Sequence, residues 1–326
     1  MIISKAPFRI SFVGGGSDLP IFYKEYGGAV LSSSINQYIY ILLKKRFEAG
    51  IRCSYSKTEI VEEASKLEHT LVRNALLDMN INDSLEIVSS ADIPSSGTGL
   101  GSSSSFSVAL INALHKHLRQ KISNKELAEY ACKLEIELAK NPIGKQDQYA
   151  AAIGGLKIYE FNQDNSVAIT SVETDDKFHK SLNDSIITFY IGGNRDANKI
   201  LINQNSPANN SKNTNTLKRM VDLVWDLKNE IEMKDIVNFG KILHENWNLK
   251  KTLDTQISNN KVDSIYNDCM DSGAIGGKLL GAGGGGFMIF IVPDQEVKNK
   301  IRKNLNRLRE VEFKLIHHGA EIVYQD

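Results

Sequence analysis

One stretch of this 326-residue chain combines glycine and serine in a pattern that suits phosphate binding. Residues 94–105 read Pro-Ser-Ser-Gly-Thr-Gly-Leu-Gly-Ser-Ser-Ser-Ser, between an expected strand and an expected helix. Glycines let backbone N–H groups approach an anion closely, and a helix start adds unpaired N–H donors and a positive dipole end. The alternative is a flexible turn with an ordinary helix cap. The pattern favours a phosphate cradle, although it is neither a Walker A loop nor a dinucleotide fingerprint, because Ser102 replaces the third glycine.

Two further glycine-rich loops lie near the two ends of the chain. Residues 281–286 match G-x-G-x-x-G, but a strand pattern follows where a dinucleotide site needs a helix. This loop either approaches another loop closely or forms a tight turn. Near the N-terminus, three glycines precede Ser17 and Asp18 and follow a strand that carries Lys5 and Arg9. Asp18 could reach a ligand hydroxyl or cap the next helix.

The carboxylates that could act in catalysis lie in the middle of the chain. Asp147 stands among Lys145, Gln146 and Gln148, where it could be a base beside a cation or a structural cap. Upstream, Glu135 and Glu137 both fall near the edge of an apolar helical stripe, so periodicity does not choose between them. Magnesium prefers oxygen ligands, and a loop serine with one of these glutamates would suit it.

Other residue types give no competing site. None of the seven histidines has metal or catalytic-triad spacing, and no C-x-x-C occurs among Cys53, Cys132 and Cys269. The cysteines therefore indicate free thiols in a reducing compartment.

Strands and helices must position these residues. In the first half we expect strands at 2–13, 29–35, 38–46, 85–93 and 155–161, and helices at 59–79, 104–118 and from a capping box at 123–126 to about 141. In the second half we expect strands at 185–191 and 287–292, helices at 217–232, 235–252 and 262–272, and a final helix and strand. The polar residues 203–216, with six asparagines, indicate a mobile loop or lid.

Length and composition restrict the class of protein. The length suggests about two domains, and the pattern of elements indicates an α/β or α+β fold. Lys plus Arg (39) equals Asp plus Glu (39), which argues against a nucleic-acid or anionic-membrane binder. No apolar run reaches the roughly 18 residues of a membrane span, and no signal peptide is visible. We therefore expect a cytoplasmic protein.

Taken together, the three loops in this order resemble the GHMP kinase superfamily. Its first motif is similar to Ala-Pro-Phe-Arg at 6–9, its second to 94–103 and its third to 278–286. Residues 14–20, 144–152 and 192–197 further resemble the sugar 1-kinase branch, which includes kinases of heptose phosphates and of fucose. The chain has the length of a stand-alone kinase, which favours the heptose phosphate kinases. Phe8 departs from the more usual glycine of motif one.

The resemblance implies a two-domain α+β fold: residues 1–180 would resemble ribosomal protein S5 domain 2, and residues 181–326 would be ferredoxin-like. It also implies ATP and Mg²⁺, with the active site between the domains. By position in the motifs, Asp147 is the catalytic aspartate, Arg9 its basic partner, and Ser103 and Glu135 the metal ligands.

The same resemblance implies which residues bind the two substrates. The ATP-binding residues are expected to be Pro94, Gly97, Thr98, Gly99, Leu100, Gly101, Ser102, Ser103 and Ser104. The sugar-binding residues are expected to be Gly15, Gly16, Ser17, Asp18, Lys145, Arg195, Gly284 and Gly285. Arg195 and Lys199 are four apart, which would place both on one helix face to hold a phosphate on the sugar.

The expected partners are small molecules, ATP and a sugar phosphate, and the protein would be a monomer or a homodimer. Two alternatives stay open: a kinase of an unphosphorylated sugar, or a non-catalytic sensor that retains the fold.

Overall fold

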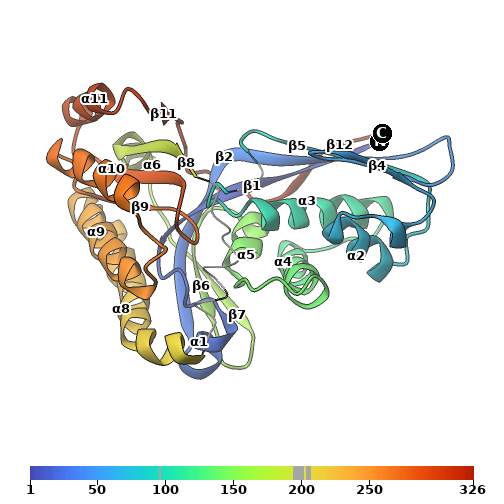
Figure 1. Ribbon diagram of the computed structural model, residues 1–326, viewed down its shortest axis with the longest axis horizontal. Coiled ribbons are helices and arrows are strands. Elements are labelled where there is room, and N and C mark those ends of the chain that lie inside the picture. Colours follow the sequence, from blue (N-terminus) through green and yellow to red (C-terminus); the bar gives the residue numbers. More distant parts are fainter. Residues whose placement is uncertain (95–96, 194–201, 203–206) are drawn as a thin grey trace.

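The computed structural model describes residues 1–94, 97–193, 202 and 207–326, and within them two β-sheets carry packed helices (Figure 1). Most strand pairs are antiparallel, and strands and helices are mixed along the chain, so the predicted α+β fold is confirmed. In this described part of the chain, no helix combines the length and the apolar character that a membrane crossing needs.

The first sheet spans most of the molecule's length (Figure 1). Its described strands are β1 (Ile2–Val13), β2 (Gly28–Lys45), β3 (Ile51–Ser54), β4 (Thr58–Val61), β5 (Leu85–Ala91), β6 (Leu156–Phe161), β7 (Val167–Ser171) and β12 (Glu321–Gln325). The order is β12-β1-β2-β5-β3-β4, with β6 pairing the other part of β2 and β7 beside β6. Through β12, the C-terminal end of the chain pairs with β1.

The long strand β2 replaces the two separate strands expected at 29–35 and 38–46. Opposite Phe8, its register against β1 shifts, because Pro7 faces Tyr38 while Arg9 faces Ser34. Polar Asn36 lies in this irregular stretch and exchanges hydrogen bonds with Lys314. A bulge therefore accommodates the polar residues that the sequence pattern suggested would end the strand.

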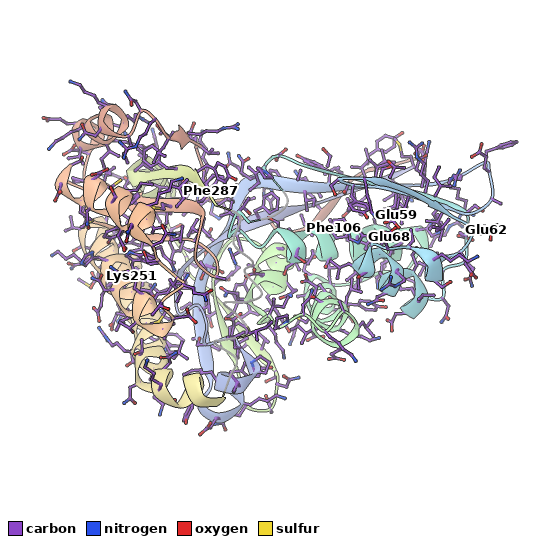
Figure 2. The ribbon with its side chains drawn as sticks, viewed as in Figure 1. Glu59, Glu62, Glu68, Phe106, Lys251 and Phe287 are labelled. Atoms are coloured by element: carbon purple, nitrogen blue, oxygen red, sulfur yellow. The ribbon has the colours of Figure 1, made fainter. Side chains whose placement is uncertain are left out.

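Helices cover one face of the first sheet. The described helices of this half are α1 (Pro20–Tyr26), the 3₁₀-helix η1 (Ala64–Lys66), α2 (Thr70–Asp78), α3 (Ser102–His117), α4 (Asn124–Cys132), the π-helix η2 (Lys133–Leu138), α5 (Gln146–Ile153) and α6 (Asp176–Ser185). The predicted capping box is confirmed, because Ser123 and Glu126 bond reciprocally at the start of α4. Phe106 on α3 lies beneath the sheet (Figure 2).

The helix expected at 59–79 was only partly correct. Its first residues form β4, which pairs with β3, and only Thr70–Asp78 is α-helix. Glu59 lies in that strand, and its carboxylate accepts the backbone N–H groups of Glu68 and His69. Strand pairing at the sheet edge and these local bonds therefore override the helical pattern.

The second sheet and its helices make up most of the second half. The described strands are β8 (Ile186–Gly192), β9 (Gly276–Leu279), β10 (Gly286–Ile291) and β11 (Arg309–Glu310), in the order β11-β8-β10-β9. The helices are α8 (Pro207–Glu232), α9 (Ile236–Leu253), α10 (Asn260–Asp271) and α11 (Gln295–Asn304).

The polar segment at 203–216 is not a loop where the structure describes it. Residues 207–216 form the first turns of α8, and 203–206 lie outside the described residues. The side chain of Asn213 is buried and donates to the carbonyl of Leu253 at the end of α9. This tertiary bond satisfies a polar group that the composition suggested would face water.

Two apolar clusters hold the described residues together. The larger packs the first sheet against α3, α4 and α5, and it continues into Leu223 of α8 and Phe239 of α9. The smaller surrounds Trp247 and the second sheet. The domain division at 180/181 stays a prediction; that position falls within α6.

Candidate active site

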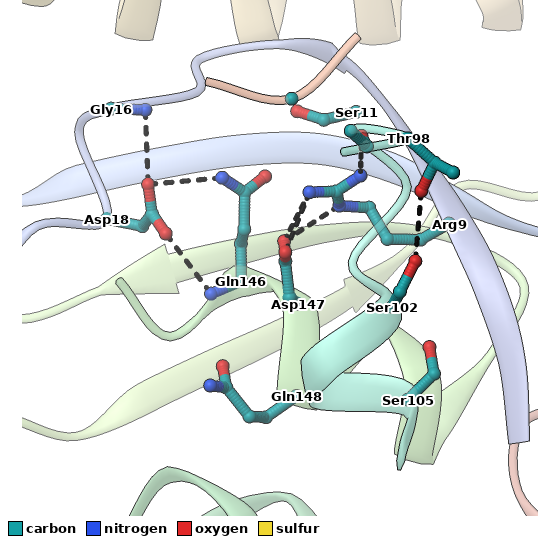
Figure 3. Close-up of polar contacts among 12 residues, drawn as sticks. Arg9, Ser11, Gly16, Asp18, Thr98, Ser102, Ser105, Gln146, Asp147 and Gln148 are labelled. Atoms are coloured by element: carbon teal, nitrogen blue, oxygen red, sulfur yellow. Dashed lines mark hydrogen bonds and ion pairs between the residues drawn. The ribbon is translucent and has the colours of Figure 1, made fainter. Parts of the chain in front are cut away.

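Arg9 and Asp147 form a partly buried, bidentate pair (Figure 3). The Nε and Nη2 atoms of Arg9 donate to the Asp147 carboxylate at 2.7 and 2.8 Å. Arg9 comes from β1 and is 4 % exposed, whereas Asp147 lies in the first turn of α5 and is 24 % exposed. The carboxylate is therefore held rigidly and still faces open space. It caps no helix.

The glycine- and serine-rich loop lies directly beside this pair. Gly99 and Leu100 offer their carbonyls to the Nη1 and backbone N–H of Arg9, at 2.8 and 3.1 Å. Gly101 has φ +76° and ends the loop at the start of α3, where no side chain caps the helix. A Cβ on Gly101 would lie 3.1 Å from the Asp147 carboxylate. The uncapped helix N-terminus and the carboxylate thus adjoin one another.

The third glycine loop packs against the same segment. A Cβ on Gly281 would lie 2.3 Å from the Cα of Gly99, and one on Gly286 would lie 2.4 Å from the carbonyl of Thr98. The N–H of Phe287, on β10 (Figure 2), donates to that same carbonyl. Of the two alternatives for this loop, the close approach to another loop is the one the structure shows.

Asp18 provides a second carboxylate in the pocket (Figure 3). Its oxygens accept from the N–H of Gly16 at 3.1 Å and from both the side chain and backbone of Gln146, at 3.2 and 3.3 Å. A Cβ on Gly144 would lie 1.9 Å from this carboxylate, so only glycine fits there. Burial and the charge of Asp147 raise the pKa of Asp18. Leu19, not Asp18, occupies the N-cap position of α1.

Glu135 and Ser103 form an oxygen-rich group beneath the loop. Ser103 Oγ donates to one Glu135 oxygen at 2.5 Å, and Gln148 donates to the other at 2.6 Å. Glu135 is completely buried, and burial raises its pKa. Glu137 is exposed, so the structure decides between the two glutamates. The π-helical turn η2 changes the helical phase that left them equivalent in the sequence.

Two buried lysines that the sequence analysis did not assign face the same region. Lys250 of α9 is 7 % exposed and donates to the carbonyl of Gly281. Lys278 of β9 is 2 % exposed and donates to the carbonyls of Ser11 and Phe12 at 2.8 and 2.7 Å. Burial lowers the pKa of both ammonium groups, and for Lys250 the value is about 8. Lys278 is the first residue of the third motif but was given no role there, and no local motif contains Lys250.

A pocket between the two halves of the chain is lined by charged groups from both halves, Arg9, Asp18, Asp147, Lys250 and Lys278, but not by Glu135 or Ser103. Its lining residues are Arg9, Ser11, Gly15, Gly16, Asp18, Leu19, Ile143, Gly144, Gln146, Asp147, Met220, Lys250, Leu253, Lys278, Gly281 and Ala282.

Some predicted sugar-binding residues lie elsewhere. The Ser17 hydroxyl is fully buried and bonds to the backbone of Gly14 and Ala29. The Lys145 ammonium donates to Asn165 rather than into the pocket. Gly284 borders a second surface pocket with Gly192 and Gly193, and Gly285 packs on those same glycines. Arg195 and Lys199 lie outside the described residues.

The expected ATP-binding residues between 94 and 104 differ in their exposure and in their contacts. Pro94 is exposed and Leu100 is fully buried in the core. The hydroxyl groups of Thr98 and Ser102 are hydrogen-bonded to each other at 2.9 Å (Figure 3). Ser103 is exposed and Ser104 is buried, and Gly97 has φ +70°.

A magnesium ion fits the group around Glu135. This carboxylate is fully buried, and among the described residues no cation is ion-paired with it. Its neighbours are a hydroxyl and an amide, and the buried Oε1 of Gln148 has no hydrogen-bond partner in the described structure. A buried, unpaired carboxylate among neutral oxygens is stabilised by a bound cation. The described residues contain no group of three or more His, Cys, Asp or Glu placed to hold a metal ion, so the ion would have one carboxylate and take its other oxygen ligands from neutral groups and nucleotide phosphates.

Two family models match the chain. The model of the GHMP kinases N terminal domain matches residues 60–155, and that of the GHMP kinases C terminal domain matches 223–310. Together they cover more than half of the chain. The chain therefore belongs to the GHMP kinase family and is a phosphotransferase with an alcohol group as acceptor.

Individual relatives agree with this family. The chain is 28 % identical over 316 residues to the D-glycero-alpha-D-manno-heptose 7-phosphate kinase of Campylobacter jejuni, covering 92 % of both. It is 25 % identical to the L-fucokinase/L-fucose-1-P guanylyltransferase of Bacteroides fragilis, over 99 % of this chain and 38 % of that longer protein. The crystal structure of a D-glycero-D-manno-heptose 1-phosphate kinase from Bacteroides thetaiotaomicron shares the fold, with a TM-score of 0.82 at 24 % identity and full coverage of both chains.

Proposed function

We propose that this kinase transfers the γ-phosphoryl group of ATP to the anomeric hydroxyl of D-glycero-D-manno-heptose 7-phosphate, which gives heptose 1,7-bisphosphate and ADP. The observation that carries the proposal is the Arg9–Asp147 pair, held against the glycine loop at the start of α3. This arrangement supports a base and a phosphate cradle at the same point. The choice of sugar rests on the relatives.

In this proposal, Asp147 orients the acceptor hydroxyl and receives its proton. The hydroxyl oxygen forms a bond to the γ-phosphorus as the bond from that phosphorus to the ADP oxygen breaks. Arg9 keeps the carboxylate in place through its two hydrogen bonds and offsets negative charge near the transferred group. Phosphoryl transfer depends mainly on positioning and electrostatics, so a weak base suffices.

Ser103 and Glu135 are the residues that would hold Mg²⁺, which neutralises phosphate charge when bound. The loop at 97–104 binds the nucleotide phosphates through backbone N–H groups and the N-terminus of α3, which lacks a side-chain cap.

Asp18 is the proposed partner of a sugar hydroxyl. Its carboxylate lines the same pocket as Asp147, and a carboxylate can accept from several hydroxyl groups. Arg195 as the residue that holds the 7-phosphate stays a prediction, because it lies outside the described residues.

An assay of ADP release with a panel of acceptors tests this function. The panel contains D-glycero-D-manno-heptose 7-phosphate, sedoheptulose 7-phosphate, fucose, galactose and no acceptor. We expect kcat/KM for the heptose phosphate to exceed that for fucose and galactose by at least about 100-fold, because a site that pairs with a phosphate discriminates strongly against its absence. It should also exceed that for sedoheptulose 7-phosphate, which carries a phosphate but differs in the sugar. A preference for a free sugar would overturn the substrate, and no ADP release with any acceptor would overturn the kinase reaction.

A further inference from the structure

Lys250 brings a positive charge from the second half of the chain into the pocket. The ammonium donates to the carbonyl of Gly281, and no carboxylate in the described part of the chain is ion-paired with it. Its side chain is buried, on the last turns of α9. The ammonium group is therefore paired only with a neutral oxygen.

The charged groups that face Lys250 are already engaged with other partners. Two nitrogens of Arg9, on β1, donate to the Asp147 carboxylate. The ammonium of Lys278, on β9, donates to two carbonyl groups of β1. Asp18 accepts three hydrogen bonds from backbone and amide groups. Burial and the charge of Arg9 lower the pKa of Lys250, against the opposing effect of Asp18. An anion in the pocket would relieve this unfavourable arrangement.

Two polar atoms in the same pocket also point to a ligand. Ser11 Oγ, on a residue that is 6 % exposed, and the Oε1 of Gln146 have no hydrogen-bond partner in the described structure. Both residues line the pocket with Lys250 (Figure 3 shows Ser11 and Gln146). Buried polar groups are normally hydrogen-bonded, so their partners are expected to come from a bound molecule.

The position of Lys250 indicates which anionic ligand its ammonium group binds. Its partner Gly281 packs on Gly99, and the carbonyl of Gly99 accepts from Arg9. Lys250 is thus connected through two residues to the Arg9–Asp147 pair. This places it where the two glycine loops meet, at the proposed point of phosphoryl transfer.

We propose that Lys250 binds the phosphoryl group while it is transferred, by donating hydrogen bonds from its ammonium to the phosphoryl oxygens. Lys250 forms and breaks no covalent bond. The inference rests on the proposed phosphoryl transfer, but not on the identity of the sugar. A cation from the second half of the chain then completes a site whose base and cradle come from the first half.

The kinetic test compares Lys250→Met with Lys251→Met. Lys251 is the next residue on α9 (Figure 2), and its ammonium lies over the rings of Trp247 and Tyr266 instead of in the pocket. We expect Lys250→Met to lower kcat by at least about 100-fold, as for the loss of a donor to transition-state charge. Lys251→Met should keep the kcat of the wild type. Lys250→Arg keeps the charge and should recover part of the rate.

A pH profile separates this role from a structural one. The ammonium form is required, so kcat/KM of the wild type should fall as the pH rises above about 8. In Lys250→Arg this alkaline decline should disappear, because an arginine stays protonated. A lysine that only orients Gly281 would leave the decline unchanged, and that result would overturn the proposal.

A binding measurement does not depend on the acceptor. Calorimetry measures the affinity of the protein for Mg-ADP alone and for Mg-ADP with aluminium fluoride, which mimics the phosphoryl group during transfer. We expect Lys250→Met to keep the affinity for Mg-ADP and to bind the aluminium fluoride complex at least about tenfold more weakly. Lys250→Gln replaces this variant if Lys250→Met does not fold. Equal losses for both would overturn the proposal.

Two further outcomes separate the failure modes. An increase confined to KM for the sugar phosphate would assign Lys250 to the phosphate that the sugar already carries, against the proposal. Failure of the wild type to phosphorylate the heptose would reject the proposed substrate, while the aluminium fluoride measurement would still decide on Lys250.

Discussion

The functional side chains are brought together from distant parts of the sequence. Arg9 and Asp147 are 138 residues apart and bond through both carboxylate oxygens. The motifs predicted both residues, but their spacing in the chain contains no information about this contact. Lys250 was missed for the same reason, because only the packing of α9 beside Gly281 places it in the pocket.

Glu135 permits a prediction at this scale. Glu135→Gln should raise the Mg²⁺ concentration needed for half-maximal activity by at least about tenfold, because a metal ligand is lost. It should also raise the melting temperature without Mg²⁺, since the buried carboxylate is costly when ionised. Because its pKa is raised in the folded protein, the free energy of unfolding should decrease as the pH rises from 4.5 through the raised value, and the variant should lose this dependence.

The matched control is Glu137→Gln, which changes the exposed glutamate two residues further on. Metal titrations of ADP release and thermal melts with and without Mg²⁺ measure both effects. Unchanged metal dependence in Glu135→Gln would remove Glu135 from the metal site.

At the scale of elements, the contact between the two glycine loops would position the proposed phosphate cradle. Gly281 has φ +73°, and a Cβ there would overlap Gly99. Gly281→Ala should lower kcat/KM for ATP on the order of 100-fold, because a displacement near 1 Å in the cradle has such an effect.

Gly27 provides the control for this change. It has the same φ of +73°, but a Cβ there would meet only the carbonyl of Phe161 at 3.9 Å. Both alanine variants bear a backbone cost of about 1–3 kcal/mol, because both positions have a positive φ, and denaturant unfolding measures it. Equal values of kcat/KM for ATP in the two variants would show that the contact between the loops does not affect the use of ATP.

The sequence predicted elements where local signals are strong. β1, α3 and the capping box of α4 all appear where expected, since each depends on periodicity or on neighbouring residues. Elements that depend on distant contacts were missed. The helical position of Asn213 depends on its hydrogen bond to the carbonyl of Leu253, and strand β9 depends on its pairing with β10. The π-turn that buries Glu135 likewise has no signal in a plain helical pattern.

At the scale of the whole molecule, the two halves meet at the pocket. Arg9, Asp18 and Asp147 come from the first half, and Lys250 and Gly281 from the second. Lys278 of β9 bonds to two carbonyls of β1 and so joins the two sheets at this point. The proposed phosphate loop, the third glycine loop and the proposed base therefore lie against one another, as preorganised catalysis requires.

The kcat of Asp147→Asn tests the central claim most directly, with ATP, Mg²⁺ and the heptose phosphate at saturation. Asparagine keeps the size of the side chain but cannot receive the hydroxyl proton, so kcat should fall at least about 100-fold. The melting temperature shows whether the variant is folded, and Asp222→Asn on the exposed side of α8 should turn over like the wild type. Near-normal turnover by folded Asp147→Asn would contradict the account.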